Sequence, residues 1–318
     1  MSASRGLRVG TRRSALALAQ AGQVAAELSR LTGSDVSLVH ITTAGDINAE
    51  SVQSMGGTGV FVTAVRDALL ARECDVAVHS LKDLPTEGHP GLVVGAIPPR
   101  ADVRDALCAR DRMTLRELPS GARVGTGSPR RAAQLRGLRD DLDVVAVRGN
   151  VDTRLGKVHD GDLDAVVLAK AGLDRLDRLH EITEDFDPLM FVPAPGQGAL
   201  AIEHRAADLD DDSAADLVRA LREMDDPHSR AAVVAERALL AALEAGCSAP
   251  VGAWARVVES AAGAPLLELT AVVMSHDGSA GVRKSATGAL AHAEELGSDL
   301  ATQLLDEGAA GLMKERVK

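Results

Sequence analysis

Residues 124–131, VGTGSPRR, contain one complete junction between a predicted strand and a predicted helix. The apolar run ends at Gly125, and a Gly-Thr-Gly-Ser turn follows. Pro129 suits the first turn of a helix, for which Ser128 is a good N-cap. Similar junctions between short apolar runs and helical stretches recur through the first ~200 residues. This alternation favours α/β sheets over a β-sandwich or a helix bundle.

The predicted strands of this region are short apolar runs bounded by turn residues. They are Leu7–Gly10, Val36–Ile41, Asp75–His79, Leu92–Ile97, Ala106–Ala109, Arg123–Gly125, Val144–Val147, Ala165–Ala169 and Ala199–His204. An amphipathic helix is expected from Ser14 to about Arg30. In the last ~100 residues, an acidic stretch leads into an Ala-rich helix, two strand-like runs and a final helix. We expect this part to be a smaller α/β domain.

Two segments have the composition of connections between domains. IPPRADVRDA (Ile97–Ala106) carries prolines and charges, and FVPAPGQG (Phe191–Gly198) clusters proline and glycine. At ~150 residues per domain, the 318 residues predict two or three domains.

Aromatic residues are very few: three Phe, one Trp and no Tyr. We therefore expect cores built from Leu, Val, Ile and Ala. The 35 Lys and Arg against 46 Asp and Glu give a net charge of −11. Both features disfavour nucleic-acid binding, which draws on positive charge and on aromatic side chains that stack with bases.

The cysteines and the N-terminus suggest a cytoplasmic location. Three cysteines without a C-x-x-C pair disfavour a disulfide framework or a zinc site, and Cys74 and Cys108 flank apolar strands, as core residues would. No apolar run approaches the ~20 residues of a membrane span. The arginine-rich start followed by SALALAQA loosely imitates a signal peptide, but its apolar part is short. A strand followed by an amphipathic helix is the other interpretation of this start.

The turn after Val124 is the strongest candidate anion site. Free backbone N–H groups and the helix dipole would favour an anion there, and Arg130 and Arg131 add donors that match carboxylate or phosphate. The Lys-Ser/Thr ending of a Walker loop is absent from the sequence. The alternative interpretation is a helix cap followed by two solvated arginines.

Arginines are concentrated around this turn. Residues 123–154 contain seven arginines and four aspartates, which predicts a cationic cleft in an otherwise acidic protein. Arg148 and Asn150 follow another strand in VRGNVDTRL, and Arg12 follows the first strand in GTRRS. Three strand-to-helix turns thus carry Arg with Ser, Thr or Asn, which points to a ligand with several carboxylates or phosphates.

Two further side chains are candidates for proton or covalent chemistry. DVAVHSLKDLP places Asp83 just after an apolar strand, where a carboxylate among cations could transfer protons or stabilise a developing cation. A surface pair of Lys82 and Asp83 is the alternative. Cys247, in LEAGCSAPVG, is either an exposed thiolate suited to covalent attachment or a small buried residue at a helix end.

Other motifs are few. GGTG, residues 56–59, predicts a mobile loop with hinge glycines. The H-E-x-x-H, G-x-S-x-G and EF-hand patterns are absent from the sequence, which argues against zinc-protease, esterase and calcium sites. We expect no bound metal.

Nine segments, taken in order, closely resemble the porphobilinogen deaminases, also called hydroxymethylbilane synthases. They are GTRRSALALAQ, GGTGVF, DVAVHSLKDLPT, VGTGSPRRAAQL, RGNVDTRL, AGLDRL, PAPGQGALAIE, AERALL and EAGCSAPVG. The resemblance covers almost the whole chain in the family's order and spacing, so it is far more specific than any one segment.

The resemblance implies an α/β fold of three domains. Two are doubly wound lobes similar to type II periplasmic binding proteins, and the third is a small α/β unit that carries the cofactor cysteine on a loop. The first domain is discontinuous in the family, so the chain should return to it after Gly198. In this sequence the domains are expected over residues 1–98 with 199–218, residues 103–193, and residues 222–318.

The resemblance also implies a monomeric transferase of tetrapyrrole (haem) biosynthesis, with no nucleic acid or membrane as partner. Four molecules of the small substrate porphobilinogen are joined head to tail, with loss of ammonia, into hydroxymethylbilane. The product grows on a dipyrromethane cofactor in thioether linkage to a cysteine, which Cys247 matches. Each porphobilinogen brings an acetate and a propionate, the type of ligand that the arginine-bearing turns indicate.

Residue by residue, Asp83 matches the catalytic aspartate, which would assist deamination and stabilise the cationic azafulvene intermediate. Gln197 matches a position in the hinge segment, and Phe61 one near the substrate pyrrole. Carboxylate-binding arginines are matched by Arg12, Arg130, Arg131, Arg148, Arg154 and Arg175. Supporting polar positions are matched by Ser14, Ser80, Lys82, Thr126, Ser128 and Asn150.

Some positions depart from the family's pattern. Ser54 and Thr58 stand where better-known bacterial members carry lysines, so the loop is less basic. Gly127 and Ser128 replace the usual Ser-Ser pair. Lys170 stands at a position that is more often aliphatic, where it would add a cation to the cleft or extend to solvent.

A non-catalytic, two-lobed polycarboxylate-binding protein is the competing function, because it would share the lobe architecture. Such a protein would need neither Cys247 nor a third domain, and it would normally carry an export signal.

Overall fold

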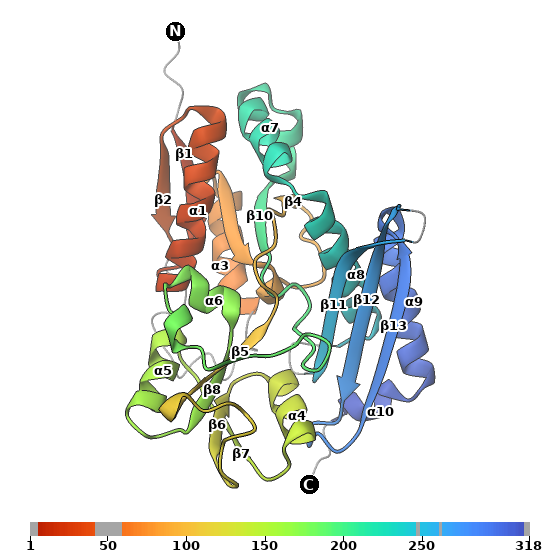
Figure 1. Cartoon of the computed structure of the whole chain (residues 1–318). Coiled ribbons are helices and arrows are strands. Elements are labelled where there is room, and N and C mark those ends of the chain that lie inside the picture. The colour runs from red at the N-terminus through yellow and green to blue at the C-terminus, as the bar shows by residue number, and fades with distance from the viewer. Residues whose placement is uncertain (1–5, 42–58, 246–248, 261–262, 315–318) are drawn as a thin grey trace. The chain divides into compact units, whose positions relative to one another are not determined.

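The chain folds into two compact units of mixed α/β structure, seen in the computed structural model of Figure 1. Unit 1 comprises Met1–Arg100 and Ala199–Arg230, and unit 2 comprises Ala101–Gly198 and Ala231–Lys318. The structure describes residues 6–41, 59–245, 249–260 and 263–314, without the side chains of residues 59–61.

Unit 1 is built on a five-stranded sheet in the order β2-β1-β3-β10-β4. Three neighbouring strands are parallel, and β10 runs antiparallel to both of its neighbours. Since β10 comes from a later part of the chain than β3 and β4, unit 1 is discontinuous in sequence. The strands are β1 (Leu7–Thr11), β2 (Val36–His40), β3 (Val76–Ser80), β4 (Leu92–Ala96) and β10 (Leu200–Arg205).

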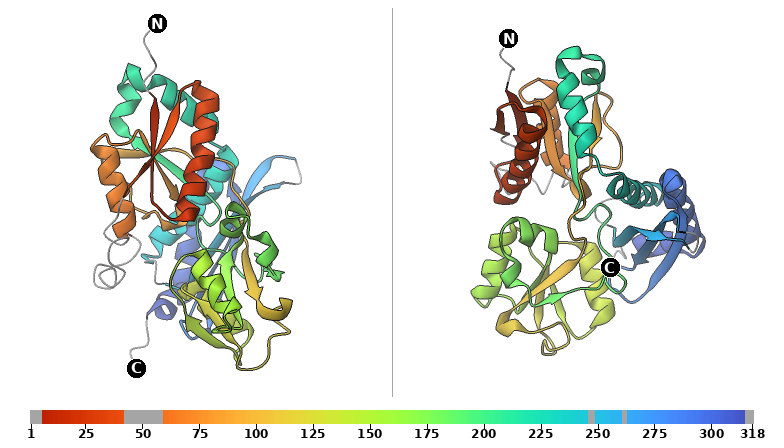
Figure 2. Two further views of the ribbon diagram at one scale, coloured as in Figure 1. Left: turned by 90° about the vertical axis from the view of Figure 1, so that its left-hand side faces the viewer. Right: turned by 45° about the horizontal axis from the view of Figure 1, so that its top comes forward.

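Helices cover both faces of this sheet, as expected for a doubly wound unit. Alternate residues of β3 point to opposite faces, so Val76 and Val78 join the core beneath α1 and α7, whereas Ala77 joins the core beneath α3. Figure 2 shows α1 and α3 on opposite sides of the sheet. These helices are α1 (Ala15–Thr32), α3 (Gly59–Leu70) and α7 (Ala215–Met224).

The first helix confirms its sequence prediction. The side chain of Ser14 accepts a hydrogen bond from the Ala17 N–H and caps the N-terminus of α1. Gly33 ends the helix in the left-handed region, with φ of 67°. Ala21, Val24 and Leu28 lie on the buried face of α1. This cap places the turn after β1 directly at the start of α1.

The first part of unit 2 repeats this plan. Its sheet has the order β7-β6-β8-β5-β9, in which β7, β6 and β8 are parallel. The helix α4 packs on one face, and α5 and α6 pack on the other. The elements are β5 (Asp105–Ala109), β6 (Arg123–Thr126), α4 (Pro129–Leu138), β7 (Asp143–Ala146), α5 (Val151–His159), β8 (Ala165–Ala169), α6 (Lys170–Arg175) and β9 (Glu184–Asp185).

The C-terminal part of unit 2 is a three-stranded antiparallel sheet, β11-β12-β13, with helices packed on one face. Ala253 and Ala255 of β11, with Leu267 and Leu269 of β12, form the centre of its core. On the other face Trp254 lies beside Arg256, whose guanidinium carbon is 5.1 Å from the indole centroid. The elements are α8 (Pro227–Ala242), β11 (Val251–Glu259), β12 (Pro265–Met274), β13 (Gly281–Ala289), α9 (Ala293–Asp306) and α10 (Ala309–Met313).

Short 3₁₀ helices complete the described structure. They are η2 (Leu81–Asp83), η3 (Arg110–Arg112), η4 (Leu179–Glu181), η5 (Ala206–Asp210), η6 (Asp212–Ala214) and η7 (Leu290–His292).

The predicted α/β fold class is confirmed, and each predicted strand is present within one or two residues of its expected ends. The expectation of two strands in the last hundred residues is wrong, because a third strand, β13, follows them. Its sequence, GVRKSATGA, consists mostly of small and charged residues of weak strand preference. This edge strand forms by pairing along its whole length with β12, which the local sequence does not reveal.

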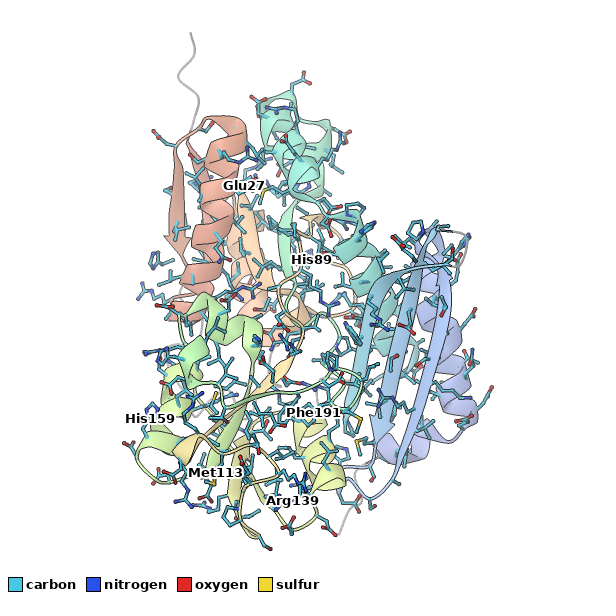
Figure 3. The ribbon with its side chains drawn as sticks, in the orientation of Figure 1. Glu27, His89, Met113, Arg139, His159 and Phe191 are labelled. Atoms are coloured by element: carbon cyan, nitrogen blue, oxygen red, sulfur yellow. The ribbon has the colours of Figure 1, made fainter. Side chains whose placement is uncertain are left out.

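The cores are aliphatic, as predicted, apart from one aromatic pair in unit 2. Phe186 and Phe191 stack with ring centroids 4.6 Å apart, and Phe191 lies beside α4 in Figure 3. Cys74 and Cys108 are buried, which confirms them as core residues. Within the described ranges, no helix combines the length and the apolar character needed to cross a membrane.

The burial of His204 predicts a pH dependence of protein stability. It is 1% exposed on β10, and its Nδ1 lies 3.8 Å from Asp208 Oδ2. Burial lowers the pKa of His204, and the neighbouring Asp208 only partly offsets this effect. Below about pH 6.5, the unfolded chain therefore binds a proton that the folded chain does not, and the unfolding free energy falls as the pH decreases.

We predict that this loss reaches up to ~1.4 kcal/mol per pH unit and that His204→Gln makes the dependence shallower. Urea unfolding at several values between about pH 7.5 and 5.5 measures both slopes. Identical slopes for the wild-type protein and His204→Gln would show that His204 is not responsible.

Candidate active site

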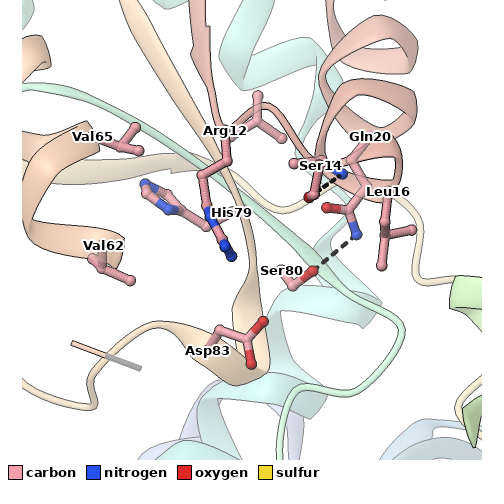
Figure 4. A pocket seen from close by; sticks show the side chains of 11 residues that line it. Arg12, Ser14, Leu16, Gln20, Val62, Val65, His79, Ser80 and Asp83 are labelled. Atoms are coloured by element: carbon pink, nitrogen blue, oxygen red, sulfur yellow. Dashed lines mark hydrogen bonds between the residues drawn. The ribbon is translucent and has the colours of Figure 1, made fainter. Parts of the chain in front are cut away.

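A pocket of about 100 Å³ lies in unit 1 at the edge where β1 and β3 end. Because the two strands are parallel, their carboxyl ends bring the residues that follow them to one place. Arg12 and Ser14 come from the turn after β1, and Ser80 and Asp83 from the end of β3 and the turn after it. Figure 4 shows the side chains of Arg12 and Asp83 pointing into the same space.

The polar groups of this pocket are held in different ways. Ser80 Oγ accepts a hydrogen bond of 2.8 Å from Gln20 Nε2 of α1. Asp83 ends η2, whose turn is closed by a hydrogen bond from the Leu84 N–H to the Leu81 carbonyl. Among the residues that the structure describes, none forms a hydrogen bond or ion pair with the Asp83 carboxylate. Asp83 is therefore available to a ligand.

A buried charge network supports the pocket from behind. Glu203 of β10 accepts two hydrogen bonds from Arg66 of α3, at 3.0 and 2.7 Å, and His79 Nε2 lies 3.1 Å from its Oε2. Burial raises the pKa of Glu203, but the hydrogen bonds from His79 and Arg66 and their charges outweigh it and lower the pKa to about 2. His79 also lines the pocket. The sequence does not reveal this network, because its members are far apart in the chain.

In unit 2, the turn after β6 has the predicted capped geometry. Ser128 Oγ accepts a hydrogen bond from the Arg131 N–H, and Thr126 Oγ1 accepts one from the Ser128 N–H. A Cβ at Gly127 would lie 2.7 Å from the Val147 carbonyl oxygen and 3.6 Å from the Arg154 Nη2 atom. The close approach to Val147 explains why glycine stands at this position, and the approach to Arg154 shows that this turn and α5 lie side by side.

Arg130 and Arg131 are buried, at 4% and 5% exposure, so the interpretation as two solvated arginines is wrong. Both contact the fully buried Asp105, with Arg130 Nη1 2.8 Å from Oδ2 and Arg131 Nη2 2.7 Å from Oδ1. Gln197 Nε2 donates to Asp105 Oδ1 at 2.9 Å. Burial alone would raise the pKa of Asp105, but the two arginine charges lower it to about 2. A carboxylate of the protein itself thus already binds these two arginines.

The start of α5 holds a second set of predicted site residues. Asn150 Oδ1 caps the helix by accepting hydrogen bonds from the Thr153 N–H and hydroxyl, at 2.8 and 2.9 Å. Arg154 is half-buried, burial lowers its pKa, and its Nε donates to the Gly149 carbonyl. Arg148 is exposed and has no partner within the described part of the chain. In α6, Arg175 donates to the Gly198 carbonyl at 2.8 Å.

The structure corrects two expectations about basic residues. The seven arginines of residues 123–154 do not all form a cationic cleft, because Arg123 lies 3.6 Å from Asp143 and Arg139 only 2.6 Å from Asp141. Arg136 donates to the carbonyl oxygens of Val144 and His276. Lys170 neither adds a free cation nor extends to solvent, since its Nζ contacts Asp185 at 2.5 Å and Asp102 at 3.6 Å.

Each unit therefore gathers part of the predicted site. Unit 1 brings together Arg12, Ser14, Ser80 and Asp83, and Lys82 lies in the same turn, η2. Unit 2 places the turns at Thr126–Ser128 and at Arg148–Asn150 side by side. Cys247, Ser54, Thr58 and the loop at residues 56–58 lie outside the described residues, as does the side chain of Phe61.

Two family models match most of the chain. The porphobilinogen deaminase, dipyromethane cofactor binding domain model matches residues 7–213, and the porphobilinogen deaminase, C-terminal domain model matches residues 231–306. This chain belongs to the porphobilinogen deaminase family.

Similar members of the family include porphobilinogen deaminase 1 of Streptomyces coelicolor, which is 54% identical over 98% of both chains. The porphobilinogen deaminase of Leifsonia xyli is 54% identical over 96% of this chain and 94% of its own. Among solved structures, a periplasmic substrate-binding protein of an ABC transporter from Coxiella burnetii aligns with a TM-score of 0.43 at 14% identity, over 68% of this chain and 91% of that one. This last likeness is too distant to bear on function.

The porphobilinogen deaminase fold of this chain offers groups that fit a dipyrromethane. Such a cofactor has two pyrrole units, and each unit derived from porphobilinogen carries an acetate and a propionate. Arg154 is half-buried without an acidic partner in the described chain, and an anionic ligand would satisfy such a guanidinium. Arg148 and the N-terminus of α5 lie next to it.

The Asp105 cluster predicts a large loss of stability in Asp105→Asn. That substitution leaves two buried guanidinium groups without a full counter-charge, and breaking such a pair typically costs ~3–5 kcal/mol. The exposed pair Asp141–Arg139 is the matched control, because Asp141→Asn removes a carboxylate that water already solvates. Chemical denaturation should show a much smaller effect for Asp141→Asn, and equal effects of the two variants would contradict the assignment.

Proposed function

We propose that this chain is an active porphobilinogen deaminase, a transferase (EC 2.5.1.61) that joins four porphobilinogen molecules head to tail into hydroxymethylbilane, with loss of ammonia. The Asp83 pocket carries this proposal, because it combines an unengaged carboxylate with Arg12 and two serine hydroxyls. We further propose that the enzyme acts in the cytoplasm as a monomer, without nucleic acid or membrane as partner.

The proposed domains are residues 1–98 with 199–218, residues 103–193, and residues 222–318. The first would supply Asp83 and the second most of the arginines. The third would carry Cys247, to which we assign the thioether linkage of the dipyrromethane. When bound, this cofactor supplies the pyrrole chain on which the product is built.

Asp83 has the chemistry that the loss of ammonia requires. As ammonia leaves the aminomethyl group of porphobilinogen, positive charge develops on the substrate, and a fixed carboxylate stabilises it best where water is largely excluded. Val62 and Val65 provide an apolar wall of the pocket, which favours such exclusion. Arg12 and Lys82 would bind the substrate carboxylates, and Ser14 and Ser80 would donate or accept hydrogen bonds.

In unit 2, most of the residues that we propose to bind the pyrrole carboxylates lie at the starts of two helices, α4 and α5. Arg148, Asn150 and Arg154 lie at the start of α5, where backbone N–H groups also favour an anion. Thr126, Ser128, Arg130 and Arg131 belong to the neighbouring turn and the first turn of α4. Gln197 lies in the segment that ends at Gly198, and Arg175 of α6 donates to the Gly198 carbonyl. Phe61 is proposed as the one ring contact of the substrate.

Intact-mass measurement tests the covalent cofactor. We expect the purified protein to carry an added mass equal to two pyrrole units, and Cys247→Ser to lack it, since serine cannot form the thioether. Cys108→Ser is the control, because Cys108 is buried in a strand and burial raises the pKa of its thiol to about 12. An active protein without the added mass would refute the assignment of the cofactor.

Replacement of Asp83 tests the chemical step. Asp83→Asn keeps the size of the side chain but removes its charge, so we expect a folded protein with its adduct and a kcat lower by ~10²–10³-fold. Asp67→Asn removes an exposed carboxylate from α3 of the same unit and should leave turnover unchanged. Steady-state release of ammonia measures both variants. Near-normal turnover in Asp83→Asn would exclude a catalytic role, and wild-type protein that binds porphobilinogen without turnover would favour the binding-protein alternative.

A further inference from the structure

Glu236 makes an unusual pair of contacts in the centre of unit 2. It lies on α8 with no exposed surface, and its two carboxylate oxygens accept hydrogen bonds from different segments. Oε1 accepts from the Ala255 N–H of β11 at 2.8 Å, and Oε2 accepts from the Gly196 N–H at 2.7 Å. One buried carboxylate thus joins the C-terminal sheet to residues 193–198, the PAPGQG segment.

The PAPGQG segment has a backbone conformation that glycine alone adopts easily. Gly196 and Gly198 have φ of 75° and 88°. A Cβ at Gly198 would lie 2.6 Å from the Ala101 carbonyl oxygen, so the segment packs directly on the backbone that leads into β5. The Gly198 carbonyl also accepts a hydrogen bond from Arg175. The position of Gln197, between these glycines, is therefore closely defined.

Gln197 continues the network from Glu236 toward the arginines. Its Nε2 donates to the Val103 carbonyl at 2.8 Å and to Asp105 Oδ1 at 2.9 Å, and its Oε1 lies 3.4 Å from Arg131 Nη2. Gln197 and Asp105 have no exposed surface, and Arg130 and Arg131 are 4% and 5% exposed. In such a dry interior, hydrogen bonds are strong and a lost partner is costly, so displacement of one member shifts the others.

We propose that Glu236 is a positioning residue for the arginine pair Arg130 and Arg131. Through Gly196 and Gln197 it sets the place of Asp105, and Asp105 sets the orientation of both guanidinium groups. The same carboxylate holds α8, which ends a short distance before Cys247, against β11. One buried network would then align the helix before the attachment cysteine with the arginines that are proposed to bind the cofactor carboxylates. This inference rests on the proposed function.

Glu236→Gln tests the proposal, because one of its two acceptor oxygens becomes an N–H₂ group that faces a backbone N–H. Thr270→Val is the matched control: it removes the 2.8 Å hydrogen bond of buried Thr270 to Ser285 in the same C-terminal sheet, away from the PAPGQG segment. Glu236→Asp, which keeps the charge but shortens the reach, serves if Glu236→Gln does not fold. Each variant is purified as folded full-length chain.

Two measurements are made on each variant. Intact mass gives the fraction of chains that carry the adduct. Hydrogen exchange gives the exchange rate of the backbone amides in peptides that span residues 126–134, which rises when this region opens more often. For Glu236→Gln we expect a fall of about tenfold in the ratio of loaded to unloaded chains and faster exchange at residues 126–134. Thr270→Val should change neither.

Faster exchange limited to α8 and β11, with full loading, would overturn the proposal and leave Glu236 a purely structural residue. A double-mutant cycle with Gln197→Ala adds a second criterion: we expect non-additive effects on exchange at residues 126–134, and additive effects would also overturn it. If the wild-type protein itself carries no adduct, the proposed function fails. The exchange measurements still decide whether Glu236 controls the arginine turn.

Discussion

The buried contact of Asp105 with Arg130 and Arg131 is the constraint on which unit 2 depends. It anchors the first turn of α4 to β5, and through Gln197 it also fixes the chain before it returns to β10. A charge cluster without solvent is stable only when each charge has its partner, so β5, α4 and the PAPGQG segment must assemble together. The first turn of α4, which follows the strand-to-helix turn at Gly127, is thereby held against β5.

The arginines of unit 2 differ in whether they have an acidic partner. Arg130 and Arg131 have Asp105 as an acidic partner, whereas Arg148 and Arg154 at the neighbouring helix start have no acidic partner in the described chain. In a chain of net charge −11, these two cations therefore lack an acidic counter-charge within the described residues. In unit 1 the same division holds for two carboxylates. Glu203 is paired with Arg66, whereas no residue of the described chain pairs with the Asp83 carboxylate in the pocket.

Much of the fold could be predicted from the sequence, since VGTGSPRR and the other strand-to-helix junctions encode strands, caps and helix starts within a few neighbouring residues. What the sequence did not reveal depends on partners that are far apart in the chain. The sequence does not show that a carboxylate of the protein already binds Arg130 and Arg131, because nothing near them in the chain identifies Asp105 as their partner. Glu203 and His79 were missed for the same reason, and β13 was missed because its pairing with β12, rather than its own residues, makes it a strand.

The pair of Trp254 and Arg256 on β11 has a spectroscopic consequence. Since the chain contains one tryptophan and no tyrosine, its intrinsic fluorescence originates almost entirely from that one indole, on one strand of the C-terminal sheet. Emission would therefore report the local environment of β11 without a background from the two lobes. Because aromatic residues are so few, Trp254 serves as a natural fluorescent probe of a single site in the C-terminal domain.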